Sequence, residues 1–230
     1  MKSNVRINLV LVICWLSAGC GESSSPAPFD PSVSRYGQDH RLIKFKDSVQ
    51  SQAPSDDNIG DFVFTDIDGN ETSLKLYRGK KLVVLVVTRG FAGSVCLYCS
   101  TQTSRLLSNY SQFTKRDAEV VVVFPIETPD DSKRQRDFVV AVKNNLDTPV
   151  EKIPFPVVLD VELKVVDQLG IRKDLSKPAT YILDKQGQTR FAYVGESLAD
   201  RPSVKALLEQ LDNLNKEAAL ESGNAGGNNP

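Results

Sequence analysis

The chain has few of the residues that build metal sites, and no excess of charge. Its 230 residues include one His, one Trp, one Met and four Cys, and its formal net charge is −1 at pH 7. A tetrahedral zinc site needs about four ligands, and the single histidine, His40, is expected to be a solvated linker residue. We therefore predict no metal ion and no other cofactor, and the near-neutral charge gives no indication of a nucleic acid partner.

Beyond the start of the chain, no apolar run is long enough for a transmembrane helix. Residues 1–19 combine the basic Lys2 and Arg6 with a mostly apolar stretch and end in small residues. This stretch is shorter than the roughly 20 residues that a transmembrane helix needs. Its pattern is typical of a secretory signal, so residues 1–19 are predicted to be a signal peptide.

The end of this segment, "LSAGC", resembles a bacterial lipobox, in which the cysteine after the cleavage point receives lipid. Leu16 stands one place earlier than in the usual pattern, and an ordinary signal that leaves Cys20 free is the alternative. The resemblance implies lipidation of Cys20, which anchors a protein to a membrane without spanning it. The expected location is the cell envelope, facing the periplasm if the organism has an outer membrane.

One domain is expected between two segments of low complexity. Residues 20–54 begin with the Ser- and Pro-rich "GESSSPAPFDPSVSR" and are predicted to be the anchor cysteine and a flexible tether. Residues 219–230 are predicted to be a disordered tail for the same reason. Residues 55–218 provide material for one ordinary domain.

Strands and helices are expected to alternate in this domain, which predicts a three-layer α/β fold. Asp68 and Gly69 indicate the turn of an N-terminal β-hairpin, and Pro202 is expected near the start of the last helix. Unbroken β-branched runs indicate central strands covered on both faces. The predicted strands are 81–87, 118–126, 155–160, 179–184 and 188–195, and the predicted helices are 97–115, 130–146 and 201–220.

The cysteine pair is the feature that carries chemistry. Cys14 would leave with the signal peptide and Cys20 would carry lipid, so Cys96 and Cys99 have only each other. An extracytoplasmic space allows such a pair to persist as a disulfide, structural or catalytic. A C-x-x-C bridge closes a very small loop and would stabilise little, so the pair makes better sense as a redox site.

The position of the pair suggests a role for each sulfur. Cys96 lies where the first central strand has ended and the 97–115 helix begins, at the sheet edge where chemistry gathers in open α/β folds. Because a helix N-terminus favours a thiolate, we predict that Cys96 is the nucleophile and Cys99 the resolving thiol. Arg89 and Lys177 would add positive charge if the fold brought them close.

From about Gly60 to Glu196 the chain resembles the thioredoxin-fold redoxins, in particular the family of alkyl hydroperoxide reductase and thiol-specific antioxidant proteins. The resemblance rests on "GDFVFTDIDGNETSL", the cysteine at the strand-to-helix junction, "FPVVLDVELKVVDQLGI" and "KPATYILDKQGQTRFAYVG". It implies a thioredoxin-like fold with a central mixed sheet flanked by helices. It also implies a redox-active disulfide.

Thiol–disulfide oxidoreductases of this fold combine a C-x-x-C pair with a proline, usually cis, before the strand that faces it. Pro178 stands at that position, and a cis bond there would expose backbone that can pair with an incoming peptide. An ordinary trans proline beginning an edge strand is the alternative. Pro178 and Arg89 are accordingly expected to bind substrate.

Peroxiredoxins carry the pattern P-x-x-x-T/S-x-x-C around their peroxidatic cysteine. Here Arg89 occupies the proline position and Gly93 the hydroxyl position, with Ser94 one place off. The long loop before Cys96 nonetheless fits their spacing, so a peroxiredoxin-like thiol peroxidase with Cys96 as the peroxidatic residue stays open.

We therefore hypothesise a membrane-anchored thiol–disulfide oxidoreductase of the cell envelope that uses Cys96 and Cys99. The expected partners are a disulfide-bonded protein or a peroxide, and a thiol electron donor that the sequence does not identify. The rival interpretations are the thiol peroxidase, a metal-binding protein and a non-catalytic protein of the same fold.

Overall fold

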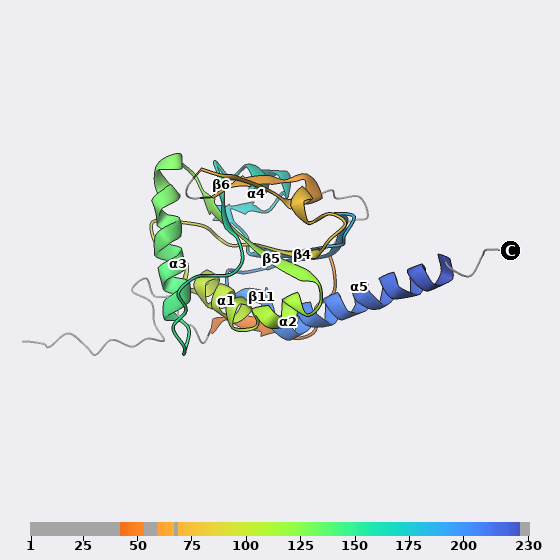
Figure 1. Cartoon of the computed structure of the whole chain (residues 1–230). Coiled ribbons are helices and arrows are strands. Elements are labelled where there is room, and N and C mark those ends of the chain that lie inside the picture. Colours follow the sequence, from red (N-terminus) through yellow and green to blue (C-terminus); the bar gives the residue numbers. More distant parts are fainter. Residues whose placement is uncertain (1–41, 53–58, 67–68, 226–230) are drawn as a thin grey trace, which may run out of the picture. The chain divides into compact units, whose positions relative to one another are not determined.

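The computed structural model describes residues 42–52, 59–66 and 69–225 (Figure 1). The predicted signal peptide, Cys20 and His40 lie outside these residues. Among the residues described, no helix has the length and apolar character needed to cross a membrane.

A seven-stranded mixed sheet forms the centre of the domain, in the order β10-β9-β4-β5-β6-β2-β3. The neighbours β4, β5 and β6 run parallel, whereas β9 is antiparallel to β4 and β10 to β9. Every residue of β4 and β5 is buried, as the unbroken apolar runs predict. The bounds are β4 Leu82–Val87, β5 Ala118–Ile126, β6 Val157–Val161, β9 Ala179–Leu183 and β10 Thr189–Val194.

The predicted N-terminal hairpin is confirmed. Strands β2 (Val63–Thr65) and β3 (Glu71–Ser73) pair antiparallel, and β2 joins the sheet because Thr65 pairs with Leu159 of β6. Short 3-10 helices, η2 (Ile59–Asp61) and η3 (Leu74–Tyr77), flank the hairpin. A second small hairpin, β7 (Arg172–Lys173) with β8 (Leu175–Ser176), precedes β9 and is absent from the sequence prediction.

Helices cover both faces of the sheet, which completes the expected three layers. Alternate residues of β4 and β5 face opposite sides: Val84 and Val122 join one buried cluster with residues of α1, α3 and α5, and Leu85 joins a second with residues of α4. Figure 1 shows α1, α2 and α5 on one side of β4 and β5, and α4 on the other. The bounds are α1 Leu97–Ser108, α2 Tyr110–Thr114, η4 Pro129–Lys133, α3 Arg134–Asn144, α4 Lys164–Gln168 and α5 Val204–Ala225.

The single helix predicted over residues 97–115 is wrong in one respect, because Asn109 divides it into α1 and α2. Asn109 has φ −111° and ψ 12°, and its side-chain amide donates to the carbonyl of Arg105 at 2.9 Å. Asparagine side chains that bond the local backbone compete with helical hydrogen bonding. The break leaves the first turn of α1, which carries the cysteines, unaffected.

The start of the last helix also differs from the prediction. Pro202 ends a short strand, β11 (Asp200–Pro202), and Ser203 caps α5 by accepting the Ala206 N–H at 3.1 Å. The helix continues through Ala225, seven residues beyond the predicted end of the domain at residue 218.

Residues 42–52, which the sequence assigns to the tether, contact the domain. Strand β1 (Lys44–Lys46) pairs parallel with β11, and the Gln52 N–H donates to the carbonyl of Ala192 in β10 at 2.7 Å. The β1–β11 pair matters for the site, because β11 carries Arg201 into the interior.

Candidate active site

The loop between β4 and α1 brings Cys96 to the edge of the sheet. Thr88 fixes its start, because the Thr88 hydroxyl donates to the carbonyl of Val123 at 2.9 Å. Gly90 has φ +89°, and a Cβ at this position would lie 2.2 Å from the carbonyl oxygen of Pro125. Only glycine fits so close an approach of loop and strand.

Cys96 is the N-cap residue of α1. Its backbone is extended, and its Sγ accepts the Cys99 N–H at 3.3 Å, which satisfies one of the free N–H groups of the first turn. The Cys96 side chain is buried, with 2 % of its surface exposed. The structure thus places this sulfur where the sequence predicts it, at the strand-to-helix junction.

Cys99 lies one turn further along α1 and is also buried. Its Sγ accepts two hydrogen bonds, from the Arg89 backbone N–H at 3.3 Å and from an Arg201 guanidinium nitrogen at 3.4 Å. The same guanidinium donates to Gln102 Oε1 at 2.8 Å and to the carbonyl of Leu198. Both cysteines are free thiols in this structure, and Cys99 is the one in contact with a cation.

The surroundings of the two sulfurs shift their pKa values in opposite directions. The hydrogen bond shared with Cys99, followed by burial, raises the pKa of Cys96 well above its ordinary value. Burial alone would raise the pKa of Cys99, but the hydrogen bond from Cys96, the charge of Arg201 and the Arg89 N–H lower it to about 6. The Arg201 guanidinium and the Arg89 N–H therefore favour the thiolate on Cys99, whereas the helix N-terminus favours it on Cys96.

Arg201 is the functional residue that sequence reasoning missed. It is fully buried, and its position is set by the pairing of β11 with β1, in which Phe45 lies opposite Arg201. The residue stands 102 positions after Cys99 in a stretch that reads as a helix start. No local pattern distinguishes a buried arginine there from a solvated one.

The prediction of a cis bond before Pro178 is wrong, since no cis peptide bond occurs among the described residues. Trans is the favoured state of an X–Pro bond by about 0.5–1 kcal/mol. Pro178 stands immediately before β9, its carbonyl accepts the Gly195 N–H at 2.8 Å, and β9 is an internal strand of the sheet.

Pro178 lines a cavity of about 270 Å³, which neither cysteine lines. Lys177 and Asp174 also line it, together with Leu198, whose carbonyl binds Arg201. The Arg89 guanidinium reaches Asp174 at 4.0 Å, while its backbone N–H binds Cys99. Arg89 thus touches both the sulfur site and the rim of the cavity, and Lys177 lies in the cavity wall.

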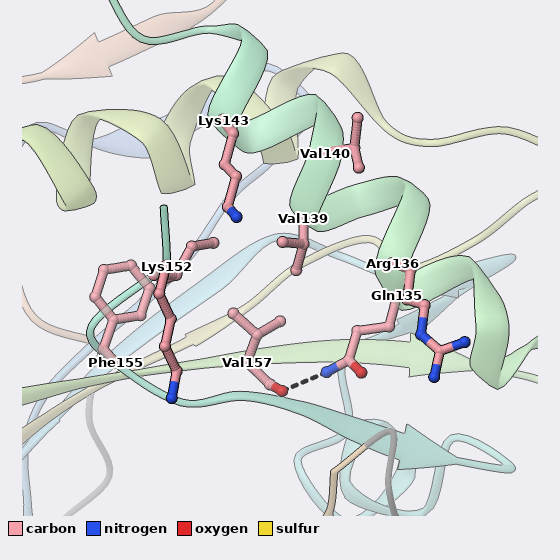
Figure 2. Close-up of a pocket in the computed structure, with 9 residues that line it drawn as sticks. Gln135, Arg136, Val139, Val140, Lys143, Lys152, Phe155 and Val157 are labelled. Carbon is pink, nitrogen blue, oxygen red and sulfur yellow. Dashed lines mark hydrogen bonds between the residues drawn. The ribbon is translucent and has the colours of Figure 1, made fainter. Parts of the chain in front are cut away.

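A second cavity lies elsewhere, between α3 and the chain around the start of β6 (Figure 2). It measures about 360 Å³, and its lining combines apolar side chains with the cations Arg136, Lys143 and Lys152. Neither cysteine lines it. In the parts of the chain that the structure describes, no cluster of three or more His, Cys, Asp or Glu side chains is suited to a metal ion.

Two buried thiols that share a hydrogen bond at the edge of an α/β sheet, one of them beside a cation, define a thiol redox enzyme. The chain belongs to the AhpC/TSA family, whose family model matches residues 55–192. Its fold is thioredoxin-like.

Individual relatives are distant and divide between two activities. Peroxiredoxin Q of the chloroplast of Oryza sativa subsp. japonica is 26 % identical over 175 residues, which cover 74 % of this chain and 70 % of that protein. The thiol-disulfide oxidoreductase ResA of Bacillus anthracis is 23 % identical over 201 residues, which cover 87 % and 94 %. A solved yeast mitochondrial 1-Cys peroxiredoxin has a TM-score of 0.58 at 14 % identity and covers 75 % and 79 %. The enzyme is therefore a thiol-disulfide oxidoreductase or a peroxiredoxin-like enzyme.

Proposed function

We propose that this protein is a thiol–disulfide oxidoreductase whose Cys96 and Cys99 alternate between a dithiol and a disulfide. The observation that carries the proposal is the pair itself: two free, buried thiols within one turn of α1, with the Arg89 N–H and the Arg201 guanidinium donating to the Cys99 sulfur. These contacts lower the pKa of Cys99, while the hydrogen bond with Cys99 raises that of Cys96. A thiolate beside a thiol is the state from which disulfide exchange starts.

Cys96 attacks and Cys99 resolves in the reaction that we propose. As the Cys96 sulfur forms a bond to one sulfur of the substrate disulfide, its proton passes to Cys99 and the second substrate sulfur leaves as a thiolate. The leaving thiolate then takes the proton from Cys99, so Cys99 is again a thiolate. Cys99 then attacks the mixed disulfide, the intramolecular bridge closes, and the first substrate sulfur leaves as a thiolate. Two electrons have moved from the pair to the substrate.

The high pKa of Cys96 suits this division of work. A sulfur with a higher pKa is intrinsically the stronger nucleophile once its proton is removed, and the Cys99 thiolate is positioned to remove it. Cys99 in turn is ionised near neutral pH, because its pKa is about 6. Cys96 is the N-cap residue of α1, where the loop from Thr88 ends, and Cys99 lies one turn inside the helix.

The wider setting that we propose rests on residues 1–20. Lipidation of Cys20 would hold the enzyme in the cell envelope, where protein disulfides persist. Its partners there would be a disulfide-bonded protein and a membrane or soluble thiol donor, and the cavity beside Pro178 and Arg89 would receive the substrate chain.

Trapping with single cysteine variants tests the roles. Cys99→Ser removes the sulfur whose hydrogen bond and charge raise the pKa of Cys96, so Cys96 can ionise by itself and attack. Because the resolving thiolate is missing, this variant is expected to accumulate a covalent mixed disulfide with a disulfide-bonded peptide, whereas Cys96→Ser is expected to accumulate none. Both variants are made in the full chain with Cys14→Ser and Cys20→Ser, so that no other thiol reacts. Adducts are read as added mass before and after reduction. Equal trapping by both variants would contradict the assignment.

Thiol peroxidase is the second candidate, and the burial of the pair favours it. Cys96 and Cys99 are 2 % and 1 % exposed, and a small peroxide reaches buried sulfur more readily than a folded protein does. In that reaction a peroxide oxygen passes to the Cys96 sulfur, giving a sulfenic acid and an alcohol or water. Condensation with Cys99 then forms the disulfide and releases water.

A further inference from the structure

Arg201 is a buried cation without a carboxylate partner in the part of the chain that the structure describes. Its side chain is fully buried, and its guanidinium binds the neutral acceptors Gln102 Oε1 and the Leu198 carbonyl. The ring of Tyr98, 6.0 Å from the guanidinium carbon, adds a cation–π contact. Because an unpaired buried charge is strongly destabilising, this site calls for an anion, and the Cys99 sulfur at 3.4 Å is the group placed to supply it.

The neighbouring carboxylate is engaged elsewhere. Asp200 accepts the Tyr193 hydroxyl at 2.8 Å and the Lys46 ammonium at 3.2 Å, and it points away from Arg201 as successive residues of a strand do. The β1–β11 pairing fixes both side chains at once, since Lys46 lies in β1. Arg201 is therefore held against α1 by the same strand pair that removes its nearest acid.

We infer that Arg201 is the counterion of the Cys99 thiolate and that it stabilises the dithiol state of the pair over its disulfide state. The inference rests on the proposed use of Cys96 and Cys99 as a redox pair. When the disulfide closes, Cys96 gives up its proton, the pair gives two electrons to an acceptor disulfide, and no anion remains beside Arg201. The guanidinium stays charged and keeps only neutral partners.

The consequence is a more oxidising pair. Stabilising the reduced form raises the potential of a dithiol/disulfide couple, so Arg201 biases this one toward accepting electrons from thiols. Arg201 touches a reacting atom and is in that sense catalytic.

Equilibrium with glutathione tests the inference. The full chain with Cys14→Ser and Cys20→Ser is held in buffers of defined reduced and oxidised glutathione, and the disulfide fraction is read by alkylation and mass. Arg201→Met is expected to raise the equilibrium constant for forming the disulfide at least about tenfold, which corresponds to a potential about 30 mV lower. Arg116→Met is the matched control: its guanidinium binds Asp212 at 2.8 Å and not a sulfur, so the constant is expected to stay within about twofold of the unaltered protein.

A pH titration needs no thiol or disulfide reagent, so it tests the counterion role of Arg201 separately from the proposed redox function. With ¹³C-labelled cysteine, the β-carbon shifts of Cys96 and Cys99 report each thiol as pH is raised. In the unaltered protein Cys99 is expected to ionise at a lower pH than Cys96. Arg201→Lys keeps the positive charge but loses the planar set of guanidinium donors, so Cys99 is expected to ionise at a higher pH in this variant than in the unaltered protein. If Arg201→Met does not fold, the titration of Arg201→Lys still tests the role of Arg201.

Some results would contradict the role of Arg201, and others would contradict the proposed function. Ionisation of Cys96 before Cys99, or equal glutathione constants in the unaltered protein and Arg201→Met, overturns the role of Arg201. If the unaltered protein forms no Cys96–Cys99 disulfide at any glutathione ratio, the proposed function fails, and the statement on redox poise falls with it. The titration alone then decides whether Arg201 is the counterion.

Discussion

The reduced protein is expected to lose stability as pH falls from 9 to 6, whereas the disulfide form is not. Cys99 has a lowered pKa in the folded state, so its thiolate stabilises the fold fully above its ordinary value of 9.0, and this contribution is lost as pH falls through about 6. A fall from 9.0 to about 6 corresponds to at most about 4 kcal/mol. Because the two thiols share one proton, the net effect is smaller than this limit.

Cys96 sets the upper limit of that window. Its pKa is raised in the folded state, so above about pH 9 the unfolded chain ionises this thiol while the folded chain does not, and stability declines again. The free energy of unfolding is measured by urea at several pH values for the reduced and the oxidised protein. Subtraction removes the titration of all other groups, and parallel curves for the two forms would contradict the thiolate assignment.

Gly90→Ala is expected to lower the free energy of unfolding by about 3 kcal/mol or more. The added methyl group would lie 2.2 Å from a backbone oxygen of β5, and the residue would keep a φ of +89°. Neither the buried strand nor a left-handed backbone relaxes easily. The loop must therefore move, and the Arg89 N–H leaves the Cys99 sulfur, so the pKa of Cys99 is expected to rise as well.

Gly93→Ala is the matched control for this prediction. Gly93 lies in the same loop with φ +74°, but a Cβ there meets nothing within 4 Å. Its replacement carries the backbone penalty alone, about 1 kcal/mol, and leaves the sulfur contacts intact. Urea unfolding compares the two variants, and equal losses would show that the close approach to Pro125 is unimportant.

The sequence predicts the core of this fold because the buried strands are local runs of apolar residues. The run 118–126 becomes β5 with the same bounds, since all nine residues are buried. Cys96 is placed at the helix start for a similar reason: the end of an apolar run and the beginning of a helical stripe are both local signals.

Arg201 and the charge of the pair depend on contacts between distant segments. Strand β1 is three residues long and reads as part of a polar tether, yet its pairing with β11 positions Arg201. The helix N-terminus favours a thiolate on Cys96, whereas the Arg89 backbone N–H and the Arg201 guanidinium favour one on Cys99. These contributions have no signature in local spacing.

The rates at which the reduced pair reacts with a disulfide and with a peroxide distinguish the two candidate functions. The fully reduced chain with Cys14→Ser and Cys20→Ser is mixed separately with a disulfide-bonded peptide and with hydrogen peroxide, and loss of the two remaining thiols is followed by alkylation and mass. We expect much faster oxidation by the peptide, ending in a Cys96–Cys99 disulfide and two peptide thiols. Much faster oxidation by peroxide would contradict it and assign the enzyme to the thiol peroxidases.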